Sequence, residues 1–117
     1  MSLTLIFSIL FFHWVFDFVC QTHWQATNKS TNNYALLQHT LVYSLSWVPF
    51  SIIVLGGSGG LFVLITFIAH TITDYFTSRL NSYLWKKGDV HNFFVSVGFD
   101  QFLHYLQLFL TFYLLTK

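Results

Sequence analysis

The sequence predicts an all-α protein, an integral membrane four-helix bundle with both termini on the non-cytoplasmic side. Of its 117 residues, 55% are hydrophobic, 21% are aromatic and 8% are charged, whereas a soluble domain carries about 25% charged residues. The mean hydropathy is +0.60. At about 20 residues per crossing, the chain is expected to form one domain of about four membrane helices, with no separate soluble domain.

Polar and glycine-rich segments divide the chain into four helices. No charged residue other than His occurs from Ser30 to Thr73, a stretch about twice as long as one crossing needs. The glycine-rich run 56–60 lies in its middle and predicts a tight reversal. The predicted helices cover about 2–24, 34–55, 61–84 and 90–115.

The ends of these helices carry their own signals. The first apolar run is interpreted as a retained helix rather than a secretory signal, because it has no basic start and no small-residue cleavage site. The polar segment 25–33 predicts a connection. Pro49 predicts a kink in the second helix, and Asp89 is the expected N-cap of the fourth.

The positive charges favour one orientation. Lys29, Arg79, Lys86 and Lys87 fall on the side of the two polar connections, and Lys117 alone falls on the side of the termini. By the positive-inside rule, the connections are cytoplasmic and both termini lie on the other side. The lipid bilayer is therefore an expected partner of this protein.

The charge and cysteine content argue against nucleic-acid binding and against cysteine-based sites. The formal net charge is +1 and no Lys/Arg cluster exceeds the pair Lys86 and Lys87, so no nucleic-acid partner is expected. The single cysteine, Cys20, rules out an intrachain disulfide and a thiolate metal motif.

Three pairs of ionisable residues stand inside the predicted helices, where each such residue costs at least about 2.5 kcal/mol. In each pair a His and an Asp are four residues apart, so both lie on one helix face. Random placement of six His and four Asp would give about 0.4 such pairs. The pairs are His13 with Asp17, His70 with Asp74, and Asp100 with His104.

A seventh polar residue, His39, lies in the second helix with Tyr43 one turn further along the same face. Because neighbouring helices run in opposite directions, all seven residues fall in the cytoplasmic half of the bundle. We predict that they bind one or two divalent metal ions. The expected metal ligands are His13, Asp17, His39, His70, Asp74, Asp100 and His104, and the expected catalytic residues are Asp17, Asp74 and Asp100.

Divalent cations would compensate buried carboxylates that the chain's lysines are not expected to reach. Imidazole and carboxylate ligands without thiolates favour zinc, with manganese or iron as alternatives. Seven ligands exceed one tetrahedral site, which makes a two-metal site the sharper prediction. The alternative is a structural polar network of protonated or mutually paired groups, without any metal.

Further polar residues are expected to orient the ligands or contact a substrate, although ordinary hydrogen bonding between helices is an equal alternative. Arg79 and Asn81 could meet an anionic substrate, or Arg79 could reach lipid headgroups. His23 and His91 lie at the membrane boundary and need no special role. The full set of supporting residues is Gln21, Tyr43, Thr66, Ser78, Arg79, Asn81 and Gln101.

Three segments carry a family resemblance: FHWVFDFVCQTHWQATNKS (12–30), HTITDYFTSRLNSYLWKKGDVHNFF (70–94) and GFDQFLHYLQL (98–108). With their paired His and Asp residues, they resemble the domain-of-unknown-function family 3307, a group of small bacterial and phage integral membrane proteins. The resemblance implies a four-helix membrane fold in the bacterial inner (cytoplasmic) membrane. It does not indicate which activity the protein has. The His-x-x-x-Asp pairs in apolar helices are also similar to those of membrane-bound metal-dependent hydrolases.

The leading hypothesis is a metal-dependent hydrolase acting on a lipid or another amphiphilic phosphoester or acyl substrate. One alternative is a proton- or metal-ion-coupled transporter or channel subunit, which with four helices would have to form a homo-oligomer. Another is a small regulatory or assembly protein with a structural metal.

Overall fold

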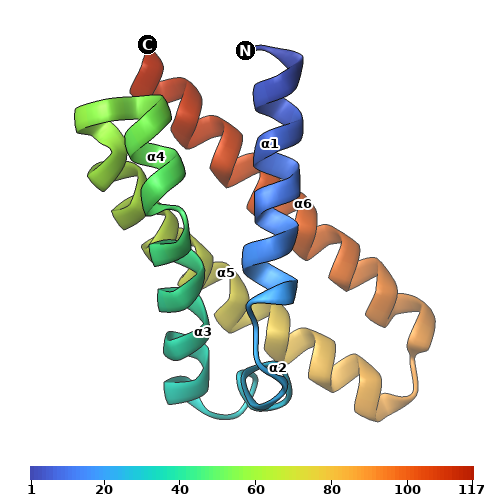
Figure 1. The fold of residues 1–117 in the computed structure, drawn as a ribbon. Coiled ribbons are helices and arrows are strands. Elements are labelled where there is room, and N and C mark those ends of the chain that lie inside the picture. Colours follow the sequence, from blue (N-terminus) through green and yellow to red (C-terminus); the bar gives the residue numbers. More distant parts are fainter.

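The computed structural model describes residues 1–117, and its regular elements are all helical, which confirms the prediction of an all-α protein. It contains four long helical segments and no strands (Figure 1). The elements are α1 (Leu3–Trp14), η1 (Val15–Val19), α2 (His23–Asn28), α3 (Asn33–Ser46), α4 (Val48–Leu55), η2 (Gly56–Ser58), α5 (Gly59–Lys87) and α6 (Val90–Thr116).

The first helical segment ends at Val19, before the expected residue 24. Its last turn, η1, is a π-helix in which the backbone N–H of Cys20 donates to the carbonyl of Val15 at 2.9 Å. Thr22 then starts α2 with a capping box, because its hydroxyl accepts from the backbone of Gln25 while the Gln25 side chain accepts from the backbone of Thr22. Part of the predicted polar connection is therefore a short helix.

The second helical segment is broken at Trp47, two residues before Pro49. A proline inside a helix removes a backbone donor, and here it stands in the first turn of the new helix α4. The chain then reverses at η2, where Gly56 has φ 60°. A Cβ atom at Gly59 would meet the backbone carbonyl of Ser51 at 2.9 Å, so a glycine there allows α5 to pack closely on α4.

The last two helices, α5 and α6, pack against each other as an antiparallel pair. Gly88 ends α5 in the left-handed conformation with φ 82°, and the Asp89 side chain caps α6 by accepting from the backbone N–H of Asn92. Both chain ends lie at one end of the bundle, while α2 and the α5–α6 turn lie at the other (Figure 1).

Polar residues dominate the interior. Of 24 buried residues, 15 are polar or charged, whereas large apolar side chains such as Ile53 and Phe76 face outward on the long helices. The apolar core is a compact cluster at the end that carries the termini. Its buried members are Ile9, Tyr43, Trp47, Phe62, Leu108 and Phe112.

One continuous helical stretch, Asn33–Lys87, has the length and apolar composition needed to cross a membrane. It folds back on itself at η2 and so contains α3, α4 and α5. The helix Leu3–Val19 is also apolar but shorter.

Candidate metal centre

The four long helical segments bring the predicted ionisable residues together in the middle of the bundle. Asp17 comes from η1 and His39 from α3, while α5 and α6 each supply one His and one Asp. All of these residues are buried, and none is more than 7% exposed. The π-helical turn widens the backbone at Asp17, and such turns are frequent at functional sites.

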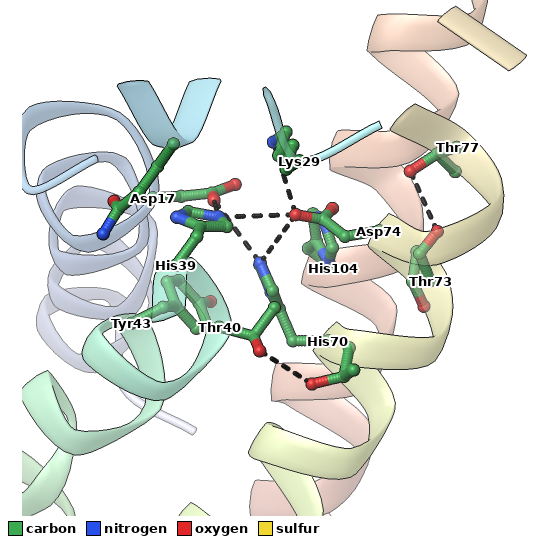
Figure 2. A network of polar contacts seen from close by, with 12 residues as sticks. Asp17, Lys29, His39, Thr40, Tyr43, His70, Thr73, Asp74, Thr77 and His104 are labelled. Atoms are coloured by element: carbon green, nitrogen blue, oxygen red, sulfur yellow. Dashed lines mark hydrogen bonds and ion pairs between the residues drawn. The ribbon is translucent and has the colours of Figure 1, made fainter. Parts of the chain in front are cut away.

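One group of four candidate metal ligands lies between η1, α3 and α5. Figure 2 shows the imidazoles of His39 and His70 pointing toward the carboxylates of Asp17 and Asp74. His39 Nε2 lies 3.0 Å from Asp17 Oδ1 and 3.3 Å from Asp74 Oδ2. His70 Nε2 lies 3.4 Å and 3.3 Å from the same two oxygens.

These distances have the size expected around a zinc ion. A regular tetrahedron with metal–ligand distances of about 2.05 Å has edges of about 3.3 Å. The four edges that join a His to an Asp run from 3.0 to 3.4 Å. Asp17 Oδ1, His39 Nε2 and His70 Nε2 are buried and make no well-aligned hydrogen bond despite this proximity. Atoms that point toward a shared centre rather than toward each other are typical of metal ligands.

A second group of three ligands adjoins the first. His104 Nε2 lies 3.1 Å from Asp74 Oδ1 and 3.2 Å from Asp100 Oδ1, and the three ligand atoms all lie within 4.8 Å of one another. Asp74 belongs to both groups: it offers Oδ2 to the first and Oδ1 to the second. A carboxylate placed in this way can bridge two metal ions.

Lys29 corrects one expectation from the sequence. Its Nζ lies 3.4 Å from Asp74 Oδ2 (Figure 2), so one lysine does reach the buried carboxylates. Burial alone would favour the neutral amine, but the negative charges of Asp74, Asp17 and Asp100 raise the pKa of Lys29. Imidazoles that bind a metal are neutral, so in a metal site one lysine against three carboxylates would leave two negative charges for the metal ions to compensate.

His13 stands beside the two ligand groups and belongs to neither. Gln101 Nε2 donates to Asp100 Oδ2 at 3.1 Å, which leaves Gln101 Oε1 to accept from His13 Nε2 at 2.7 Å. His13 Nδ1 is then an acceptor and receives the Tyr43 hydroxyl at 2.8 Å. Both ring nitrogens are occupied, so His13 supports the site from outside, 3.6 Å from Asp17 Oδ2.

Two other predicted supporting residues act through packing and hydrogen bonds. The Tyr43 ring stacks on His70 with centroids 3.9 Å apart, and His70 in turn stacks on His104 at 4.1 Å. Gln101 links His13 to Asp100, as described above. Tyr43 and Gln101 therefore hold ligand side chains in place.

The remaining predicted supporting residues divide between a cavity and the outside. Gln21, Ser78 and Asn81 line an open cavity of about 630 Å³ that also reaches Asp17 and Asp100. Arg79 is not part of its lining. The guanidinium of Arg79 lies over the Tyr75 ring and donates to Asn33 Oδ1 and to the Tyr75 carbonyl. Thr66 accepts from Gln107 Nε2 at 3.1 Å.

Sequence reasoning missed two residues that contact ligands. Thr77 Oγ1 donates to Asp100 Oδ1 at 2.6 Å, and its position one turn after Thr73 and three residues after Asp74 was the available signal. Lys29 had no local signal, because its approach depends on how α2 folds over the site. That fold is held by Gln25 Nε2 donating to Gln38 Oε1 and by Ser82 Oγ donating to Ser30 Oγ.

Comparisons with known proteins bear on the family. The model of a family described as a protein of unknown function (DUF3307) matches residues 5–117. No curated protein and no solved structure matches the chain. The similarity to membrane-bound metal-dependent hydrolases gains no support from these comparisons.

Proposed function

We propose that this chain, which belongs to the DUF3307 family, is a membrane-embedded hydrolase with two divalent metal ions in its His/Asp site. One observation carries the proposal: Asp74 is shared by two ligand groups whose interatomic distances of 3.0–3.4 Å are those of ligands around a small divalent ion. Zinc fits this donor set best, with manganese and iron as alternatives.

A location in the bacterial inner membrane as a multi-pass protein is part of the proposal. The polar interior and apolar exterior support it, since large apolar surfaces on a soluble monomer are rare. At 1.5 Å per residue, the 29 residues of α5 and the 27 of α6 extend over about 40 Å each, enough for a bilayer. The lysine excess near the connections favours termini on the non-cytoplasmic side.

An open position favours catalysis over a purely structural metal site. Structural zinc sites are closed by four protein ligands, whereas catalytic sites keep a position for water or substrate. The second group has three protein ligands, and Asp17 and Asp100 line the cavity of about 630 Å³. A substrate in this cavity would meet both halves of the site.

Bound metal ions would supply an activated water and polarise a phosphoryl or carbonyl oxygen. One of the two carboxylates that line the cavity, Asp17 or Asp100, would accept the proton of the attacking water and pass it to the leaving oxygen. The new bond joins the water oxygen to phosphorus or to the acyl carbon, the ester bond breaks, and the leaving oxygen takes up a proton. Asp74 would contribute a ligand atom to each of the two metal ions. The expected substrate is a lipid or another amphiphilic ester.

The test is elemental analysis of the protein purified in mild detergent without chelator. We expect about two equivalents of zinc, manganese or iron per chain in the wild type. Asp74→Ala removes the shared ligand and should abolish binding at both positions, whereas His70→Ala should remove about one equivalent. The exposed His91 provides the control, because His91→Ala should keep the wild-type content. Circular dichroism checks that each variant remains helical.

Metal-loaded protein is then assayed against chromogenic phosphoesters and acyl esters in mixed micelles. Turnover that disappears in Asp74→Ala supports the hydrolase. Protein that binds no metal on purification and none on reconstitution contradicts it, and favours a proton-coupled conduit using the same His and Asp residues. Retention of both metals in Asp74→Ala contradicts the shared-ligand arrangement.

A further inference from the structure

The cavity beside the candidate metal centre is lined by positive charges, by polar atoms without partners and by aromatic rings. It lies between η1, α2 and the adjoining ends of α5 and α6, and Asp17 and Asp100 lie in its wall. It is the larger of the two cavities that stand out in the structure, since the other has about 400 Å³ and contacts none of the predicted ligands. A molecule inside it would lie against both ligand groups.

Positive charge is the first feature. Lys29 and Lys86 both line this cavity. Lys29 extends over the carboxylates with its side chain 20% exposed, and Lys86 stands at the outer end of α5. Lys29 Nζ lies beside the ligand carboxylates, 3.4 Å from Asp74 Oδ2, and Lys86 lies toward the outer end of the cavity. Together with the proposed metal ions, these two ammonium groups would attract an anion.

Polar atoms without partners are the second feature. Gln21 Oε1, Ser78 Oγ and Asn81 Oδ1 are buried, line the cavity and make no hydrogen bond within the protein. Ser78 is only 6% exposed. Buried polar groups of this kind are normally satisfied. Ser78 Oγ can donate to a phosphate oxygen, whereas the amide oxygens of Gln21 and Asn81 only accept and would be met by water or by a hydroxyl group of the ligand.

An aromatic wall is the third feature. Trp85, Phe93 and Phe94 line the cavity, and the Trp85 and Phe93 rings contact each other with centroids 5.0 Å apart. Phe94 is 62% exposed on the outer face of α6. An apolar chain held against this wall can therefore continue from the cavity onto the surface that the proposed bilayer covers.

We propose that this cavity binds an amphiphile carrying a phosphate ester, with the phosphate between Lys29, Lys86 and the metal site and the alkyl chain along Trp85, Phe93 and Phe94. This rests on the proposed function for the metal ions and narrows it, because it selects phosphoesters over acyl esters. Two metal ions about 4 Å apart suit the oxygen atoms of a phosphoryl group, as in known phosphatases. The negative phosphate and the positive lysines attract each other, so the cavity should bind a phosphate ester in preference to a neutral acyl ester.

The probe is an alkyl phosphate with a bromine near the end of its chain, added to zinc-loaded protein in uncharged detergent micelles. Bromine quenches nearby indole fluorescence, and Trp85 is the tryptophan in the cavity wall. The signal of interest is the saturable quenching that Trp85→Phe removes. We expect unlabelled alkyl phosphate to compete at least about tenfold better than an alkyl acetate or an alkyl trimethylammonium of equal chain length.

Inorganic phosphate and methyl phosphate separate a free phosphate from a lipid-like one. Both should compete at least about tenfold more weakly than the alkyl phosphate, because they leave the aromatic wall uncovered. Equal competition by inorganic phosphate would overturn the amphiphile. Equal competition by the alkyl acetate would overturn the phosphate.

Matched variants test the two ends of the cavity. Lys86→Gln should weaken alkyl phosphate binding about fivefold, whereas Lys87→Gln, on a neighbouring residue outside the cavity, should leave it unchanged. Phe94→Ala should weaken binding about fivefold, and Phe99→Ala, equally exposed on the same helix outside the cavity, should not. Equal losses within either pair would contradict the assignment.

Metal content is measured in every sample, which separates the two proposals. Protein that holds metal but binds alkyl phosphate no better than alkyl acetate overturns this inference and leaves the hydrolase proposal standing. Protein without metal overturns the hydrolase proposal, and this inference, which rests on the metals, falls with it.

Discussion

The two halves of the bundle interior differ in polarity: one is apolar and the other is lined by ionisable side chains. Near the termini the interior is an apolar cluster in which Trp47 lies at the centre of several edge-to-face ring contacts, including those with Phe16, Phe50 and Phe62. Toward the other end it is a cluster of carboxylates and imidazoles within about hydrogen-bonding distance of one another. Packing of apolar side chains holds the first half together, whereas in the second half the proposed metal ions would compensate the buried negative charges.

The same helices contribute to both halves. The two halves can still be disturbed separately, because their residues lie far apart along each helix. Phe62 and Asp74 both lie on α5, twelve residues and about 18 Å of helix apart. A substitution at that separation should act on one half without altering the ligands of the other. Each prediction below tests this independence.

The largest effect is expected in the apolar half. Phe62 is 1% exposed, and Phe62→Ala should lower the free energy of unfolding by about 3 kcal/mol because it leaves a cavity against Trp47. Phe76→Ala, on the same helix but 66% exposed, is the control and should change it little. Unfolding in increasing proportions of an ionic detergent, followed by tryptophan fluorescence, measures both. Metal content per folded chain should remain at the wild-type value, and its loss would show that the halves are coupled.

A somewhat smaller effect per site is expected from removing metal. A ligand that binds only the folded state at about 100 times its Kd stabilises it by about 2.7 kcal/mol per site. Zinc added to stripped wild-type protein should raise the free energy of unfolding by at least this amount, and a chelator should reverse the gain. Phe62→Ala should show the same increment and Asp74→Asn should show none. A gain in Asp74→Asn equal to that of the wild type would place the metal elsewhere.

The polar half was more predictable from the sequence than the apolar half. Ionisable residues are rare in such a chain, so three His/Asp pairs at a spacing of four stand out, and their heights in the helices follow from the connections. The apolar cluster cannot be found in this way, because apolar side chains occur on every face of these helices: the buried Phe62 has exposed leucines, Leu61 and Leu64, beside it in the same apolar run. The all-helical class and the cap at Asp89 followed from local chemistry.

Two features of the polar half depend on tertiary structure. The π-helical turn at Val15–Val19 moves Asp17 into the first ligand group while His13 turns to Tyr43 and Gln101. Ideal α-helical spacing treats His13 and Asp17 as equivalent ligands and cannot separate them. Likewise, Lys29 reaches Asp74 only because α2 folds over the site.

An intermediate effect is expected from a residue that supports one ligand. Thr77 Oγ1 donates to Asp100 Oδ1, and Thr77→Val should weaken zinc binding at the second ligand group about tenfold while leaving the first group unchanged. Thr71→Val is the control, since the Thr71 hydroxyl is hydrogen-bonded to the Phe67 carbonyl and the Thr40 hydroxyl instead. Titration with a competing chelator resolves the two affinities. Equal weakening in both variants would mean that the change is a general loss of packing.

The smallest effect lies outside both halves, at the start of α6. Asn92 donates from its side chain and its backbone to the carboxylate of Asp89, and these hydrogen bonds lower the pKa of Asp89. Because this pKa is lower in the folded chain, the charged cap contributes stability above the ordinary carboxyl range, and the contribution disappears as pH falls below about 4. Asp89→Asn keeps a capping side chain without the charge. The wild type should therefore be slightly more stable than Asp89→Asn at neutral pH and equal to it in acid, and a difference that persists in acid would mean that the charge is not the cause. Metal content should be the same in both chains at neutral pH, since the cap lies outside both ligand groups.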